Sequence, residues 1–172
     1  MQLHDLTVPV YIQMLGTLSG LVVKAADSGN AEALFAARLA PDMFPLATQI
    51  RFTCGQAGEA VQRLTGKAFT APAEDDATPS AAKARIAATL AYLEQATPDD
   101  FADPELPVEL ALPNGMTFGM TAEQYVRDWA MPQFYFHLVS AYAILRQQGV
   151  PIGKADYVPY MARYLVSGPA LG

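Results

Sequence analysis

His137 is the residue of this sequence with the widest range of possible chemistry, and Gln133 precedes it by one helical turn. A neutral imidazole can hold a metal ion, exchange a proton near neutral pH, or donate and accept hydrogen bonds. A helix over this stretch would place His137 about 60° from an apolar stripe, at the border of a buried interior. The stripe is formed by Phe134, Leu138, Ala141 and Leu145. His137 is therefore expected either to face a pocket or to be a hydrogen-bonded histidine at the edge of the core.

Other routes to catalysis have little support in the sequence. Cys54 is the single cysteine, which excludes an intrachain disulfide and a cysteine-based zinc cluster. Its place on an apolar seam favours inert packing over nucleophilic reactivity. The segment Gly149 to Ala155 is one residue too short for a phosphate-binding loop, and Ala155 stands where that loop needs Ser or Thr. No G-x-S-x-G motif is present, so we expect neither covalent catalysis nor a cofactor.

The composition limits the class of protein. The chain has 172 residues, of which 52% are hydrophobic and 16% charged, and this fits one packed domain over residues 1–172. Its net charge of −6 and its scattered basic residues provide no field to neutralise phosphates, so no nucleic-acid partner is expected. The first residues do not form a signal peptide, and no run approaches the roughly 18 apolar residues of a membrane span. We therefore expect a cytoplasmic protein without a membrane partner.

Four segments have the apolar spacing of amphipathic helices. Thr7 is expected to cap the first of them, with Pro9 in its first turn, and Asp42 is a candidate cap for the second. The expected helices run from near Thr7 to Ser28, from Pro45 to about Leu64, from Thr78 to about Leu93, and from Pro132 to Gln148.

The region between the third and the last of these helices is rich in proline. Asn114-Gly115 lies there between two short alternating segments, 108–112 and 116–118, and Asn-Gly is a strong local signal for a β-hairpin. The acids at positions 74–76 are expected to be solvated charges near the start of the third helix. The fold class is therefore all-α: a four-helix bundle with a proline-rich loop or small hairpin before the last helices.

Several blocks of the sequence, in the same order along the chain, resemble the uncharacterised family DUF1993. They are MQLHDLTVP at 1–9, ARLAPDMFPL at 37–46, Phe136-His137 with AYAILR at 141–146, Gly149-Val150, and GKADY at 153–157. The resemblance spans residues 1 to about 157, and the family has no established activity. It is grouped with the DinB/YfiT-like superfamily, which implies a four-helix bundle that is often a homodimer.

The resemblance also implies a possible metal site, because many members of that superfamily bind a divalent ion through three histidines. The superfamily's last-helix pattern pairs two histidines four residues apart with a later Leu-Arg and Gly. Here His137, Leu145, Arg146 and Gly149 match, but Gln133 replaces the first histidine. The second helix, which supplies the third ligand, has no histidine and offers Gln49 instead. One imidazole and two amides hold a transition metal poorly, so we expect no bound metal.

Three hypotheses for function follow, and the sequence names no substrate for any of them. The first is a bundle that binds a small molecule or a partner in a cleft lined by six polar residues. These candidates are His137, Gln133, Gln49, Arg38, Asp42 and Tyr142. The second is a metal-dependent enzyme of the superfamily's thiol-transferase type, with His4 or Asp42 recruited as ligands. The third is a purely structural dimer.

Overall fold

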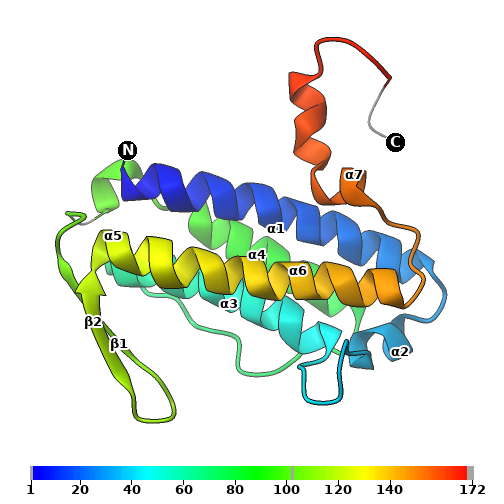
Figure 1. Ribbon diagram of the computed structural model, residues 1–172, viewed down its shortest axis with the longest axis horizontal. Coiled ribbons are helices and arrows are strands. Elements are labelled where there is room, and N and C mark those ends of the chain that lie inside the picture. Colours follow the sequence, from blue (N-terminus) through cyan, green and yellow to red (C-terminus); the bar gives the residue numbers. More distant parts are fainter. Residues whose placement is uncertain (1, 102, 170–172) are drawn as a thin grey trace.

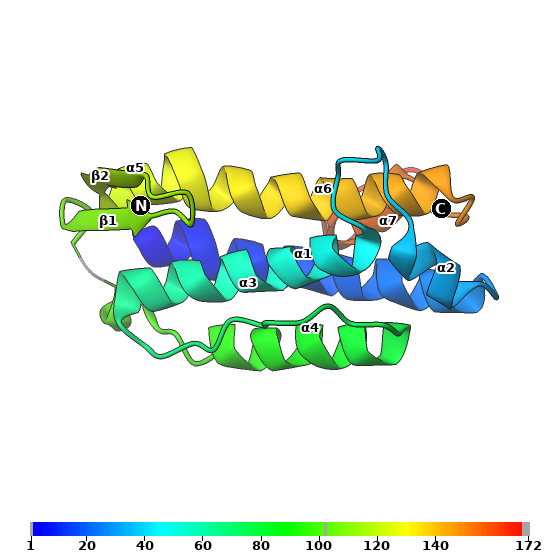
Figure 2. The same cartoon turned by 90° about the horizontal axis from the view of Figure 1, so that it is seen from below.

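The computed structural model describes residues 2–101 and 103–169, and four long helices dominate it. They are α1 (Leu3–Asp27), α3 (Leu46–Thr65), α4 (Pro79–Leu93) and α6 (Met131–Gln147). α1 packs against α4, and α3 packs against both α4 and α6. Figures 1 and 2 show the four axes lying roughly along one direction, with α6 and α4 on opposite sides of the α1–α3 pair. The predicted four-helix bundle is confirmed.

The smaller elements join these helices or extend from them. They are α2 (Ala31–Ala36), a 3-10 turn (Pro98–Asp100), β1 (Pro107–Ala111), β2 (Thr117–Thr121), α5 (Ala122–Tyr125), a π-helical turn (Val126–Ala130), α7 (Lys154–Tyr157) and a C-terminal 3-10 helix (Pro159–Tyr164). The strands β1 and β2 form an antiparallel hairpin in which Pro107 pairs with Thr121 and Ala111 with Thr117. Gly115 has a φ of 86° in the turn, as the predicted Asn-Gly hairpin requires.

The core is formed by the predicted apolar stripes. On α3, the apolar seam that contains Cys54 is buried along its whole length, and its positions three or four residues apart are Ala47, Ile50, Cys54, Ala57, Val61 and Leu64. On α6, Phe134, Leu138, Ala141 and Leu145 are fully enclosed. These two stripes face each other, because burying both apolar faces requires them to pack together. The α3–α6 contact therefore places His137 beside α3.

Two predicted helix caps are wrong. α1 begins at Leu3, so the Thr7 hydroxyl is buried inside the helix and donates to the Leu3 carbonyl at 2.7 Å, and Pro9 lies beyond the first turn. α3 begins at Leu46 with Pro45 as its N-cap and no side-chain cap, so Asp42 remains exposed in the preceding turn. The Thr78 cap of α4 is observed, since its hydroxyl accepts from the amide of Ala81.

Of the three acids at positions 74–76, Glu74 is exposed as expected, but Asp75 and Asp76 form ion pairs and are not free solvated charges. Asp75 pairs with Arg51 of α3, whose Nε lies 2.6 Å from Oδ1 of Asp75. Asp76 pairs with Arg85 of α4, whose Nη2 lies 2.9 Å from Oδ1 of Asp76. These pairs attach the loop before α4 to two helices of the bundle, because each guanidinium meets a carboxylate from the loop.

The chain runs from α5 into α6 without a break, although Pro132 lies in the first turn of α6. The π-helical turn at Val126–Ala130 precedes this proline. Proline has no N–H and crowds the preceding turn, and a π turn is one way in which a helix accommodates such a change. The chain therefore accommodates Pro132 by a local widening of the helix.

α1 is the one helix among the described residues that is long and apolar enough to cross a membrane, although no membrane span is expected from the sequence. Its apolar stripe is enclosed by the bundle: Tyr11, Leu15, Leu18 and Val22 are fully buried. A core helix passes the same test of length and composition, and the burial of this stripe identifies α1 as one.

The C-terminal segment leaves the bundle after α7. In Figure 1 the red 3-10 helix Pro159–Tyr164 stands off from α1 and extends away from the four helices. Tyr160 is half-buried against the bundle, whereas Met161 and Tyr164 are exposed, and Val166, just after the helix, is 98% exposed. We call residues 158–169 the C-terminal arm.

Candidate functional site

His137 and Gln49 form the polar centre of the interface between α3 and α6. Nδ1 of His137 lies 2.8 Å from Oε1 of Gln49. Gln49 is fully buried and His137 is only 8% exposed. The side-chain nitrogen of Gln49 donates to the backbone carbonyl of Phe44 at 3.2 Å. Gln49 therefore connects the histidine to the loop that precedes α3.

Three aromatic rings surround this polar centre. The Phe52 ring lies 4.9 Å from the imidazole of His137, and the Phe136 ring 5.3 Å from it in an edge-on arrangement. Phe44 packs edge-on against Phe52 at 5.2 Å. Phe44 and Phe136 are 54% and 56% exposed, so they form an apolar rim around a buried imidazole.

Burial controls the charge of the histidine. Desolvation lowers the pKa of His137 from 6.5 to about 4, because a buried imidazolium loses hydration that the neutral ring does not need. Arg51 stacks over Phe52 at 4.4 Å, on the side of α3 that contacts His137, but its charge is paired with Asp75. His137 is therefore neutral at physiological pH.

The structure brings some of the six predicted site residues together. Gln133 lies one turn before His137 on α6, on the same side of the helix, and is half-buried. Arg38 is exposed, and its Nη1 lies 3.5 Å from the carbonyl of Pro41 and 3.3 Å from that of Met43. It thus supports the loop that presents Phe44. Asp42 is exposed in the same loop.

Tyr142 belongs to a different part of the surface. Its ring packs edge-on against Tyr157 of α7 at 5.5 Å, and it lines a small hollow with Val139, Lys154 and Tyr157. It lies five residues after His137, which turns it about 140° around the helix. Tyr142 therefore does not join the site at Gln49.

Phe44, Phe52 and Phe136 were not identified as site residues from the sequence. Phe52 follows Gln49 by three residues on α3, and residues three apart share a helix face. That spacing was a usable signal for Phe52. Phe44 lies in an irregular loop, where no periodicity indicates the direction of a side chain.

The donor set at this centre does not fit a three-histidine metal site. Gln133 and Gln49 stand where the resembled superfamily has histidines, and amide groups are weak donors for zinc or nickel. Among the described residues, no three His, Cys, Asp or Glu side chains lie close enough to hold a metal ion. Asp42 and His4 are not brought to His137 as ligands.

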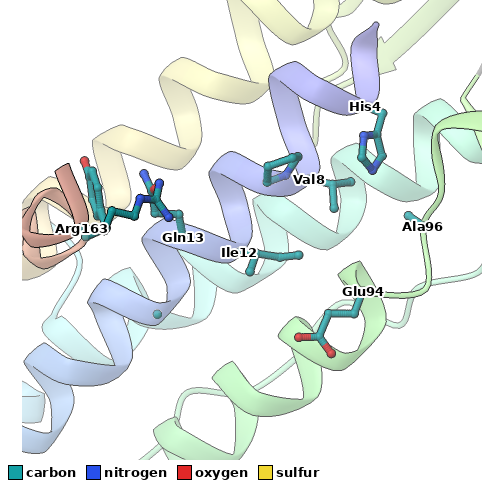
Figure 3. A pocket seen from close by; sticks show the side chains of 10 residues that line it. His4, Val8, Ile12, Gln13, Glu94, Ala96 and Arg163 are labelled. Carbon is teal, nitrogen blue, oxygen red and sulfur yellow. The ribbon is translucent and has the colours of Figure 1, made fainter.

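His4 instead lines a separate groove between α1 and α4, with a volume of about 700 Å³. Its ring packs edge-on against Phe101 at 5.4 Å. Figure 3 shows His4 and Glu94 at one end of this groove and Arg163 beside Gln13 at the other. Nη2 of Arg163 donates to Gln13 at 2.8 Å, which ties the C-terminal arm to α1.

Cys54 is excluded as a nucleophile. It is fully buried on the α3 seam, and burial raises the pKa of its thiol to about 12. A thiol that stays protonated and enclosed does not attack a substrate, as the sequence indicated.

Comparisons with known proteins agree with this architecture. The profile of the family described as "Domain of unknown function (DUF1993)" matches residues 3–158. A solved structure of a DinB family member from Shewanella denitrificans has 36% sequence identity to this chain, a TM-score of 0.80, and coverage of 91% of both chains. A comparison with curated proteins finds no match. The chain belongs to the DUF1993 family, and its fold is that of the DinB-like four-helix bundles.

Proposed function

We propose that this protein binds a small molecule at the α3–α6 interface, and that Gln49 and Gln133, at the positions where the resemblance implies histidines, give this chain a metal-free polar centre. One observation carries the proposal: the hydrogen bond of 2.8 Å between His137 and Gln49, both buried, beneath the exposed rings of Phe44 and Phe136. A buried polar pair under an apolar rim has the make-up of a ligand site, in which a few fixed polar groups orient an apolar ligand.

The revised binding surface is smaller than the one expected from the sequence. It consists of His137, Gln49 and Gln133 with the three phenylalanines, while Arg38 and Asp42 belong to the loop that carries Phe44. The amides of Gln49 and Gln133 do not supply the metal ligands that a metal-dependent thiol transfer would need. A binding function in the cytoplasm therefore has more support than a metal-dependent thiol transfer.

Self-association is a second candidate function, and the C-terminal arm favours it. Met161, Tyr164 and Leu165 are exposed, in addition to Val166. Clustered exposed apolar side chains often mark an interaction surface, and most homo-oligomers are two-fold dimers. A homodimer would bury the arm without using the site at His137.

The binding proposal is tested by nuclear magnetic resonance with a library of small aromatic fragments. We expect fragments to shift the amide resonances around Gln49, Phe52 and Phe136, and His137→Phe to abolish these shifts. His4→Gln is the matched control, since it removes the only other histidine from a separate groove. Shifts confined to the α1–α4 groove of Figure 3, or no shifts at all, would overturn the proposal.

A further inference from the structure

The hydrogen bonds around Gln49 determine which nitrogen of His137 carries the proton. A backbone carbonyl only accepts hydrogen bonds, so the atom of Gln49 that faces the Phe44 carbonyl must be its NH₂ group. The amide oxygen of Gln49 therefore faces His137. Because an amide oxygen also only accepts, Nδ1 of His137 must donate. The neutral imidazole is fixed as the tautomer with its proton on Nδ1.

Nε2 of His137 consequently carries a lone pair and no proton. It has no hydrogen-bond partner among the described residues, and yet it is not a sealed atom. Among the described residues, the side-chain polar atom that is both fully enclosed and without a hydrogen-bond partner is Oη of Tyr11. Nε2 of His137 also lacks a partner, so it cannot be fully enclosed. Nε2 is therefore not sealed from solvent, and it offers a hydrogen-bond acceptor on an imidazole that packs against the rings of Phe52 and Phe136.

We infer that the site selects neutral aromatic molecules that bear a hydrogen-bond donor, such as a phenolic hydroxyl, and rejects carboxylates. This inference rests on the proposed binding function and specifies its ligand class. The donor would meet the lone pair on Nε2, and the ligand ring would contact the apolar rim of Phe44 and Phe136, whose quadrupoles favour offset or edge-on packing.

Anions are disfavoured by the same geometry. A carboxylate oxygen would face the lone pair on Nε2, and two acceptors cannot share a hydrogen bond. Protonating the imidazole would remove this conflict, but burial opposes the charged form, as the lowered pKa of His137 indicates. Arg51, the cation on the wall formed by Phe52, is already paired with Asp75.

Three probes of similar shape test the inference: phenol, anisole and benzoate, titrated at pH 7 into protein with ¹⁵N-labelled histidine. Before any addition, we expect Nδ1 of His137 to resonate as a protonated nitrogen and Nε2 as an unprotonated one. Phenol should shift the Nε2 signal and bind about tenfold tighter than anisole, which has the ring but no donor, because one added hydrogen bond has about that effect. Benzoate should leave the signal unchanged.

A pair of charge variants on α3 sharpens the test. Gln49→Glu places a carboxylate next to Nδ1, which favours the imidazolium and a proton on Nε2, so the preference for phenol over anisole should disappear. Gln56→Glu is the matched control: it adds the same charge to the same helix, two turns further along. It should keep the preference.

The possible outcomes separate the two claims. Anisole binding as tightly as phenol, benzoate binding as tightly as phenol, or a proton on Nε2 in the free protein would overturn the inference while leaving a binding site in place. If none of the three probes perturbs His137 or the amides of α3 and α6, both the inference and the proposed function fail.

Discussion

Gln49 and His137 are 88 residues apart in the sequence, and their side chains meet at 2.8 Å in the interior of the bundle. The contact joins α3 to α6 through a polar bond inside an otherwise apolar interface. Because Gln49 also donates to the Phe44 carbonyl, one amide fixes both the histidine tautomer and the loop before α3.

The stability of the protein should fall in mild acid because His137 is buried neutral. Its pKa is about 4 in the folded protein and about 6.5 in the unfolded chain, so the unfolded state binds more protons between these values. The contribution of neutral His137 to the free energy of unfolding is therefore fully present above pH 6.5. It is lost as the pH falls towards 4, and the loss is about 3 kcal/mol at most. Urea unfolding of the wild type and of His137→Phe between pH 4 and 7.5 measures it. Parallel curves for the two proteins would show that His137 does not titrate in this way.

Gln49→Leu should destabilise the fold by about 1–3 kcal/mol, because it leaves the buried Nδ1–H of His137 and the Phe44 carbonyl without their partner. Gln133→Leu is the comparison, since Gln133 is half-buried one turn from His137, and it should change the free energy of unfolding by less than about 0.5 kcal/mol. Chemical denaturation at pH 7 gives both values. Equal losses for the two variants would mean that the hydrogen bond to His137 is not the source.

The sequence predicted the fold well where apolar periodicity decided it. The stripes on α3 and α6 were identified, and their mutual burial places His137 opposite the second helix, as expected. Residue type alone predicted the helix caps less well. Thr7 and Asp42 have the residue types of caps, but tertiary packing extends α1 back to Leu3 and starts α3 at Leu46.

The candidate site was predicted only in part, for a similar reason. Helical geometry related His137 to Gln133, and the family resemblance pointed to Gln49. The roles of Arg38 and Phe44 depend instead on an irregular loop closed by the bond from the Leu46 amide to the Ala37 carbonyl at 2.9 Å. Tyr142 was grouped with the site because of its residue type, although its position on α6 directs it towards Tyr157.

Tyr11→Phe should leave stability unchanged or increase it. The Tyr11 hydroxyl is fully buried and has no partner among the described residues, while the centroid of the Tyr11 ring packs 4.7 Å from that of Phe134. Removing an unpaired buried hydroxyl relieves its desolvation cost while the ring packing stays. Tyr92→Phe is the control, because Tyr92 donates to the Lys67 carbonyl at 3.0 Å and its loss should cost about 1 kcal/mol. A loss for Tyr11→Phe as large as for Tyr92→Phe would reveal a hydrogen bond made by Tyr11.

The protein should be a homodimer at micromolar concentration, with the C-terminal arm in the interface. Light scattering should give about twice the chain mass of 18.5 kDa for the wild type and a monomer for Leu165→Asp combined with Val166→Asp, because charges on an apolar contact oppose its burial. Phe136→Asp changes an exposed apolar residue outside the arm, and this variant should remain dimeric. A wild-type monomer at high micromolar concentration would contradict the prediction.

Metal binding provides the last prediction, because it separates a binding protein from a metal-dependent enzyme. With Gln133 and Gln49 in place of two imidazoles, His137 alone cannot fix a tetrahedral or octahedral ion. The purified protein should therefore carry no stoichiometric transition metal, and zinc or nickel should not move its Tm, since an ion that binds the native state weakly adds little stability.

Gln49→His combined with Gln133→His should rebuild the three-imidazole set. An ion at about 100 times its Kd would then add about 2.7 kcal/mol, which corresponds to roughly 5–10 °C in Tm for a domain of this size. The same two changes in a His137→Ala background are the control and should show no such rise. Elemental analysis that finds about one equivalent of metal in the wild type, lost in His137→Ala, would refute the prediction and support the thiol-transferase alternative.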